Sequence, residues 1–512
     1  MSENGPHRSE NETREALLQH VTAVEAEMVR MRGLLLEKEK ERLRLYSKIN
    51  SLSPFDQLPA EIKTEIFYNA VSPLTALYGS GGLLNPFFLG KICHGWRDFV
   101  WSTPILWTTL YLQLSTDNYE AQTILLRDWL SRTGEYPISF CLDTEEFLEM
   151  RDYESPIEVL TLFASVSTRW REIEISLPNL RACFDTISIT ETSLPLLTTA
   201  TVQLDAIDEE LNLLMAPQLS ELHLYQPLLH QVLAPWHQLR EFFADGCYVD
   251  EIRFFLHNAP HIVCCTFSNI ESSILEPSLD QELFRRPLLL ERLQYLELRF
   301  NNVNVESTWI LKQVRLPSLR EFSLSTPEYS PQDAAPLQIT NSFQSSPLLE
   351  KFTWDGMVMS DRDLIQALKN IPSVKDLSLH PISYSPWIKL LTGEFLRRLY
   401  PPHTEILLPN LRSFSYHGAT SLNEDMHLFR DVLVYRFREC ALRAAEIDSE
   451  RTTIAQIKSV SVTSSSECVV SPDIQEELKS LAQAGLEFTF HFRSHPGGMK
   501  SLRTLNGVLV LE

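Results

Sequence analysis

The chain has 512 residues and 44% hydrophobic content, enough for several domains or one extended array, so a disordered protein is excluded. Its formal net charge of −22 disfavours nucleic acid and anionic membrane surfaces as partners. We expect a cytoplasmic or nuclear protein that is not secreted, because we find no apolar signal core, no membrane-length apolar run, and no even framework among the eight cysteines.

The N-terminal residues are expected to form a polar disordered tail over 1–15 and a coiled-coil helix over 16–52. Apolar residues recur there at alternate spacings of four and three, the heptad pattern of a coiled coil. The seam is Leu17, Val21, Val24, Met28, Met31, Leu35, Lys38, Arg42, Leu45, Ile49 and Leu52. Lys38 and Arg42 interrupt its apolar character at two successive positions. The pattern therefore leaves two interpretations, a homodimer of undetermined orientation or a single charged helix.

The stretch 58–107 predicts a small helical unit. Pro59 suits the first position of a helix, where its missing N–H would have had no partner. The residues that follow at helical spacing on one face are Ile62, Ile66, Phe67 and Ala70. After a glycine-rich turn at 79–82, a second apolar set at helical spacing comprises Leu89, Ile92, Trp96, Phe99 and Val100. A unit of roughly 50 residues needs support from a partner or from the rest of the chain.

Three motif pieces within 53–111 resemble the F-box family, and most closely its large fungal group with irregular leucine-rich repeats. The pieces are Leu-Pro-Ala-Glu-Ile at 58–62, Cys-His-Gly-Trp-Arg at 93–97 and Pro-Ile-Leu-Trp at 104–107. The resemblance implies a small all-α bundle that inserts into the Skp-type linker of a cullin-RING ubiquitin ligase. The spacer at 75–90 is longer than in the shorter family pattern. The alternative to an F-box is an ordinary helical hairpin.

By the same resemblance, five residues would dock on the linker and three would form the core of the bundle. The linker-docking residues are Leu58, Pro59, Ile62, Ile66 and Phe67. The core residues are Ile92, Trp96 and Trp107.

Beyond residue 111 a repeating pattern predicts a leucine-rich-repeat-like α/β solenoid with a curved parallel sheet over 112–512. A typical copy has Pro217, then Leu219, then the apolar pair Leu222 and Leu224. The first apolar residue of nine copies falls at 197, 219, 239, 262, 293, 319, 349, 374 and 411, mostly near the 20 to 29 residues of such a repeat. Each apolar pair should lie in a short strand and point into the core. The alternative is a mixed α/β domain with chance leucine periodicity.

Other segments fit the same array. Helices are expected near 125–134, 157–170, 361–369, 435–450 and 473–484. Additional strands are expected at 137–142, 173–175, 460–463 and 488–490, with a loop at 464–466.

No motif for catalysis, a cofactor or a metal stands above background. The glycine-rich run at 79–82 lacks the Gly-Lys-Ser/Thr of a phosphate-binding loop, and Cys93 with His94 has no second ligand pair. The outward positions of the predicted strands have mixed charge, which suits a protein or peptide partner more than nucleic acid. They are Glu221, His223, Tyr225, Arg299, Glu321, Lys351, Asp376, His380 and His417. The alternative is that these are ordinary solvated strand residues.

These expectations combine into a non-catalytic substrate-recognition adaptor of an SCF-type ubiquitin ligase. Its partners would be the Skp-type linker and an unknown protein substrate, with a homodimer through the coiled coil. A scaffold or self-associating module with a degenerate F-box is the main alternative. An enzyme with its site at a loop rim is the third.

Overall fold

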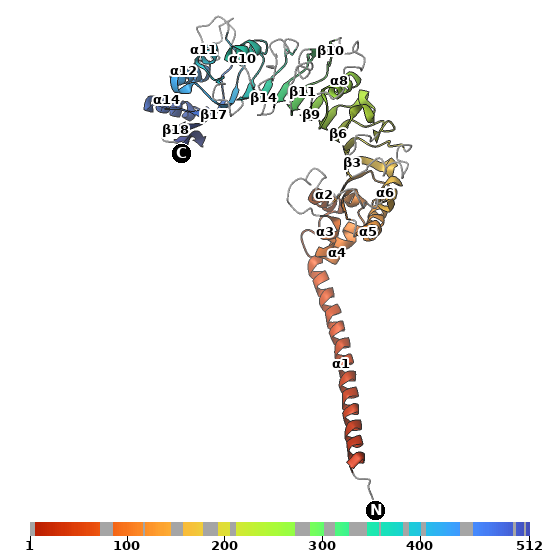
Figure 1. Ribbon diagram of the computed structural model, residues 1–512. Coiled ribbons are helices and arrows are strands. Elements are labelled where there is room, and N and C mark those ends of the chain that lie inside the picture. Colours follow the sequence, from red (N-terminus) through yellow and green to blue (C-terminus); the bar gives the residue numbers. More distant parts are fainter. Residues whose placement is uncertain are drawn as a thin grey trace, which may run out of the picture. The chain divides into compact units, whose positions relative to one another are not determined.

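A computed structural model gives the fold of the protein (Figure 1). It describes residues 6–71, 85–115, 118–144, 157–177, 193–204, 211–271, 287–301, 313–326, 346–357, 360–381, 389–400, 406–440, 454–494, 498–505 and 508–511. The expected glycine-rich turn at 79–82, and most of the spacer that contains it, lie outside the described residues. The chain forms two compact units, one of Met1–Leu112 with Glu120–Cys141 and one of Gln113–Tyr119 with Leu142–Glu512.

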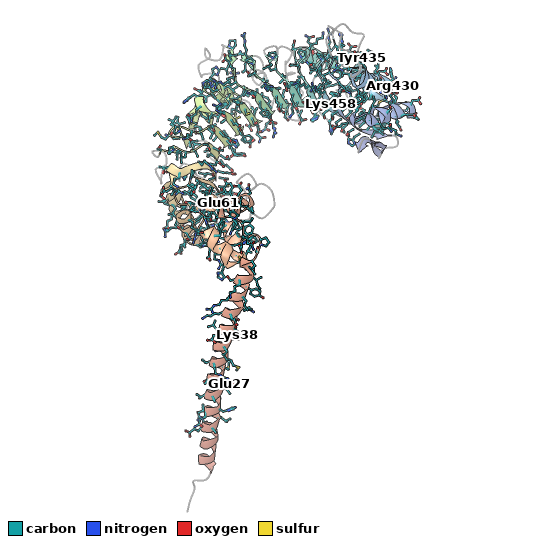
Figure 2. The ribbon with its side chains drawn as sticks, turned by 180° about the vertical axis from the view of Figure 1, so that it is seen from behind. Glu27, Lys38, Glu61, Arg430, Tyr435 and Lys458 are labelled. Carbon is teal, nitrogen blue, oxygen red and sulfur yellow. The ribbon has the colours of Figure 1, made fainter. Side chains whose placement is uncertain are left out.

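The first unit begins with helix α1 (Pro6–Ser51), 46 residues and about 70 Å long. Its start corrects the expectation of a disordered tail over 1–15 for residues 6–15. Proline suits a first helical turn, and the Glu, Arg and Ala residues that follow favour helix. Glu27 and Lys38 project from α1 in Figure 2. All nine apolar seam residues between Leu17 and Leu52 are at least 43% exposed, so the described part of the chain leaves the seam uncovered.

A helical module follows α1 in the first unit. It contains α2 (Ala60–Ala70), α3 (Pro86–Ile92), α4 (His94–Trp101), a 3₁₀ turn (Pro104–Trp107) and nearly all of α5 (Tyr119–Arg132). The strands β1 (Thr109–Leu114) and β2 (Ile138–Thr144) begin in the first unit and end in the second. Side chains cap two of the helices: Asn85 accepts from the Phe88 N–H at 2.9 Å, and Cys93 Sγ accepts from the Trp96 N–H at 3.4 Å. The first unit includes Glu120–Cys141, and with it nearly all of α5, in addition to the residues up to Leu112.

Two aromatic clusters hold the module together. Phe55, Phe67, Trp96 and Phe99 form one, and Phe87, Trp101, Trp107 and Trp129 form the other. In the second, Trp129 Nε1 donates to the Trp107 carbonyl at 2.6 Å. The α3 helix approaches α4 so closely that a side chain at Gly90 would overlap the Trp101 ring. Ring packing of this kind is worth more than the buried area alone.

The second unit is built on a long sheet. Its strands are β3 (Trp170–Ser176), β4 (Thr199–Gln203), β6 (Glu221–Tyr225), β8 (Glu241–Asp245), β9 (Cys264–Ile270), β11 (Tyr295–Phe300), β13 (Glu321–Ser325), β14 (Lys351–Met357), β15 (Asp376–Pro381), β16 (Ser413–Gly418), β17 (Ser459–Glu467), β18 (Glu487–Ser494), β19 (Gly498–Leu505) and β20 (Val508–Leu511), side by side in that order. Every junction from β3 to β18 is parallel, and the last two are antiparallel. Short pairs β5 (Leu211–Asn212) with β7 (Val232–Leu233) and β10 (Leu288–Leu289) with β12 (Val314–Arg315) lie apart from it.

All nine predicted apolar pairs lie in strands of this sheet, and they are in register. Leu222, for example, aligns with Ala200 on one side and with Phe242 on the other. The first apolar residue of each copy is also no more than 1% exposed. The periodic pattern thus located the buried ladders correctly, and the mixed α/β class with a large parallel sheet is confirmed.

Helices pack on one side of the sheet, and Figure 1 shows α8, α10 and α11 on the outer side of a curved array of strands. The bounds are α6 (Ile157–Ala164), α8 (Val249–Asn258), α10 (Asp361–Leu368), α11 (Gly393–Arg398), α12 (Leu422–Val434) and α14 (Pro472–Gln483). The helices expected at 361–369 and 473–484 are confirmed. The one expected at 435–450 is helical in its described part, as a π-helical turn (Tyr435–Glu439) that continues α12, and 441–450 lie outside the described residues.

The loop expected at 464–466 is wrong, because β17 continues to Glu467. Serine usually marks a turn, but here the hydroxyls have partners within the fold. Ser464 Oγ lies 2.8 Å from Thr420 Oγ1, and Ser466 Oγ accepts from the Thr420 N–H at 3.1 Å. These bonds satisfy the polar side chains where the strand extends beyond its apolar pair.

Candidate functional site

Helix α2 presents apolar side chains at its surface. Ile62 is 48% exposed and Ile66 is 43% exposed. Pro59, just before the helix, is exposed and Leu58 is half-buried. Four of the five residues expected to dock on a linker are therefore accessible on or beside one short helix.

Phe67, the fifth residue expected to dock, is a core residue instead. It is 2% exposed, and its ring lies 4.7 Å from Trp96 and 5.1 Å from Phe55 between centroids. Helical spacing places Phe67 beside Ile66 but does not decide which of the two turns inward. The large flat ring fills the bundle, and the smaller aliphatic side chain is left at the surface.

The three residues expected in the core of the bundle differ in burial. Trp107 is fully buried and donates from Nε1 to the Val100 carbonyl at 2.8 Å. Trp96 is half-buried against Phe67. Ile92 is 53% exposed, so its assignment to the core is wrong. It is the last residue of α3, where the chain turns into α4, and the described part of the chain leaves its side chain uncovered.

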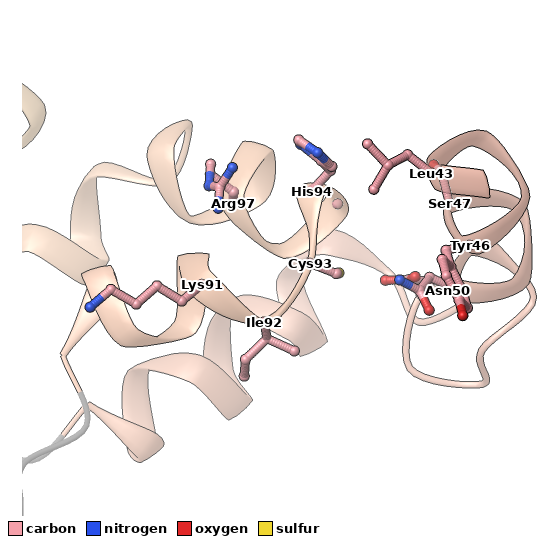
Figure 3. A pocket seen from close by; sticks show the side chains of 11 residues that line it. Leu43, Tyr46, Ser47, Asn50, Lys91, Ile92, Cys93, His94 and Arg97 are labelled. Carbon is pink, nitrogen blue, oxygen red and sulfur yellow. The ribbon is translucent and has the colours of Figure 1, made fainter. Parts of the chain in front are cut away.

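Ile92 lies at a pocket of about 430 Å³ between the last turns of α1 and the junction of α3 and α4. Figure 3 shows Cys93 and His94 at this junction, facing Leu43 and Asn50 of α1. The ionisable groups that line the pocket come from separate elements and form no ion pair among the described residues. The pocket therefore supports no catalytic assignment.

The exposed face of the sheet carries the residues expected to contact a substrate. Because side chains alternate along each strand, Glu221, His223 and Tyr225 stand on the side opposite to the buried Leu222 and Leu224. His223 Nε2 lies 3.0 Å from Glu221 Oε1. Burial raises the pKa of the Tyr225 hydroxyl, and the nearby carboxylates Glu174 and Asp245 raise it further.

Further along the face, the expected residues form short-range pairs. Arg299 Nη2 lies 2.7 Å from Glu297 Oε1, and Lys351 Nζ lies 3.3 Å from Glu321 Oε2. Asp376 is exposed one strand beyond Lys351, in register with it. The Lys351–Glu321 pair is exposed at both ends and contributes little to stability, whereas in the other pair Arg299 is exposed and Glu297 is largely buried.

His380 and His417 come together near the C-terminal end of the array, with ring centroids 6.1 Å apart. His380 Nδ1 lies 3.9 Å from Asp355 Oδ1, and its Nε2 lies 3.1 Å from Ser378 Oγ. Burial lowers the pKa of His380, the neighbouring His417 lowers it further, and Asp355 opposes both effects. The His380 ring is therefore mainly a neutral hydrogen-bonding group near pH 7.

Phe243 is an outward residue that the sequence pattern missed. It is adjacent to the core residue Phe242, so apolar periodicity alone assigns both to the interior. In β8 the burial alternates, and Phe243 stands on the exposed face beside His223 and Tyr225 at ring-centroid distances of 5.7 and 5.3 Å. Phe243 is two residues from Glu241 and two from Asp245, and alternation along a strand places all three on the same side. That spacing was the signal that could have identified it.

Among the described residues, no group of three or more His, Cys, Asp and Glu side chains could hold a metal ion. No helix within the described ranges is long and apolar enough to cross a membrane. The comparisons with known proteins add no family: a scan against protein-family models finds no match, and a search among curated proteins finds none either.

Proposed function

We propose that the protein is a substrate-recognition adaptor whose helical module docks on the Skp-type linker of a cullin-RING ubiquitin ligase. The observation that carries this proposal is the exposed apolar face of α2. Ile62 and Ile66 lie in the solvent on a helix that also begins with the Leu58-Pro59 motif. These isoleucines are one helical turn apart, and aromatic rings fill the core of the module without them. Exposed apolar side chains at this spacing favour binding of a partner helix.

The second unit suits the recognition role. We infer that it is a leucine-rich-repeat-like solenoid, because parallel strands recur in register while their returns differ in length. Such arrays expose a continuous sheet face that can contact an extended partner. The catalytic step would belong to other subunits of the ligase.

A pull-down of the full chain with the Skp-type linker tests the docking. Leu58→Asp with Ile62→Asp places two charges on the α2 face and should abolish capture. The matched control is Leu214→Asp with Met215→Asp, which places the same two charges on exposed apolar residues of the second unit, 53% and 50% exposed. Capture that survives the α2 double variant would rule out docking through this face.

A self-associating scaffold is the second candidate, and the exposed seam of α1 favours it. Nine apolar side chains at heptad spacing in the solvent are typical of a helix that pairs with another. Self-association and linker docking use different surfaces, so an adaptor could also be a dimer. The seam is tested separately below.

A further inference from the structure

The aromatic and acidic patch on β6 and β8 is the feature that the proposed function leaves unexplained. Phe243 lies in register with His223, and Asp245 lies in register with Tyr225. The three rings thus meet on the exposed face of two adjacent strands, where the neighbouring outward residues are otherwise polar. A phenylalanine ring held half-exposed on a sheet face gains little from burial there, so its position favours a contact outside the chain.

Carboxylates surround these rings. Glu221 stands on the same strand as His223, and Asp245 on the same strand as Phe243. Glu174 on β3 is close enough to act electrostatically on Tyr225. Aromatic faces attract cations through the negative face of the ring, and carboxylates add charge-assisted hydrogen bonds. The patch therefore combines the two groups that bind a cationic side chain.

Ser268 supplies an independent indication of a missing partner. It lies on β9, in register with Asp245, and is only 7% exposed. Its hydroxyl has no hydrogen-bond partner among the residues that the structure describes. A buried hydroxyl without a partner costs about 1 to 3 kcal/mol, so the strand next to Asp245 carries an unsatisfied polar group directly beneath the patch.

We propose that this patch, defined as Glu174, Glu221, His223, Tyr225, Phe243 and Asp245, binds a lysine or arginine side chain of a protein segment lying along the sheet. This assignment rests on the proposed function, since it names the kind of substrate that the second unit would recognise. The cation lies against Phe243 and Tyr225, and the carboxylates accept its N–H groups. A nucleic-acid backbone is disfavoured, because its phosphates would meet the same carboxylates.

The test is a selection of random dodecapeptides displayed on phage against the immobilised full chain. Peptides selected on the wild-type protein should be enriched in Lys or Arg. For the best of them, fluorescence anisotropy should show about tenfold weaker binding to Phe243→Leu, which keeps an apolar side chain but removes the aromatic face. Asp245→Asn should weaken binding by a similar factor.

The matched control is Glu487→Gln, which removes a carboxylate from the same face at the distant strand β18 and should change binding less than twofold. Absence of Lys or Arg enrichment overturns the assignment. So does binding that Phe243→Leu leaves unchanged, or an equal loss in Glu487→Gln, which would indicate general charge attraction.

The linker pull-down separates this assignment from the adaptor proposal. Phe243→Leu should retain linker capture, and Leu58→Asp with Ile62→Asp should retain peptide binding. If the peptides bind at the patch and the linker is not captured, the adaptor proposal is rejected and the patch assignment stands. If the linker is captured and the peptides do not bind at the patch, only the patch assignment is rejected.

Discussion

The guanidinium of Arg436 donates from Nη1 to the carbonyl oxygen of Leu408 at 2.8 Å, and so fixes a residue whose φ is +49°. Its other nitrogens donate to the carbonyls of Leu407 at 2.7 Å and Leu399 at 3.0 Å. Arg436 is fully buried, and burial lowers its pKa to about 10. It therefore stays protonated near pH 7, and backbone oxygens offset the cost of burying its charge.

Replacing Arg436 with Met should destabilise the second unit by about 3 to 5 kcal/mol, because three buried carbonyls lose their donor at once. Urea denaturation followed by circular dichroism measures the loss. Arg430→Met is the control, since Arg430 makes a partly exposed pair with Asp431 and should shift stability by less than about 1 kcal/mol. Equal effects of the two variants would contradict a special role for Arg436.

Glu251 should make stability fall as the pH rises from about 4.5 to 7. Burial raises its pKa to about 7 from an ordinary value of 4.5, so the folded state holds the proton more tightly than the unfolded chain does. Glu251 causes no loss of stability below pH 4.5, where the side chain is protonated in both the folded and the unfolded state. The loss is complete above pH 7, where the side chain is ionised in both states, and amounts to up to about 3 kcal/mol.

Glu251→Gln tests this pH dependence. The two carboxyl oxygens accept from the N–H of Leu229 at 2.7 Å and from that of Tyr248 at 3.1 Å. At pH 5 the protonated carboxyl group still has an acceptor lone pair on each oxygen, whereas an amide has a single acceptor oxygen. The variant should be less stable than wild type at pH 5. This difference in stability should be smaller at pH 8, because only the wild type loses stability as Glu251 ionises. Melting temperatures of both proteins at the two pH values provide the measurement. Parallel pH profiles would show that Glu251 does not titrate as described.

Leu35→Asp should convert a dimer of the full chain into a monomer in multi-angle light scattering. Leu35 lies in the heptad seam, where a carboxylate would be buried between helices. The control is Leu36→Asp, which alters the next residue, also exposed (53%) but outside the seam. It should leave the dimer intact. A monomeric wild-type chain would refute pairing through α1.

Lys38→Leu with Arg42→Leu should tighten the same association at least tenfold, because two charged layers of the seam become apolar. Sedimentation equilibrium gives the dissociation constants. An unchanged constant would mean that these two positions do not face the partner helix.

Trp129→Ala should destabilise the first unit by about 3 to 5 kcal/mol. The indole is 5% exposed, lies 4.9 Å from Trp107 between ring centroids and donates to its carbonyl. Leu125→Ala on the same helix is the control, since that residue is 42% exposed. Near-ultraviolet circular dichroism during thermal melting reports the loss. A similar melt for both variants would place α5 outside the module.

The sequence located the buried ladders of the sheet because two signals coincide there, apolar residues two apart and a proline before them. It was less informative in the helical module. A helical period shows that Ile62, Ile66 and Phe67 are neighbours but does not say which of them meets the core. For Ile92 the period indicated burial, yet this residue at the end of α3 is 53% exposed.

The candidate binding face was predicted in part for a related reason. Outward positions were assigned from apolar neighbours, which succeeded for His223 and Tyr225. Phe243 was not predicted, because this assignment takes apolar residues as inward and so cannot recognise an apolar residue at an outward position. Likewise the serines at 464–466 indicated a turn, since the partners that keep them in a strand come from a distant segment around Thr420.

The parallel registers hold across the sheet although successive copies of the pattern are 20 to 37 residues apart. Each return segment therefore absorbs its own difference in length without shifting the strands on either side. As a result, evolution can exchange outward side chains one strand at a time. The exposed face of the sheet is modular in this sense, because an outward side chain of one strand can be replaced while the interior stays the same.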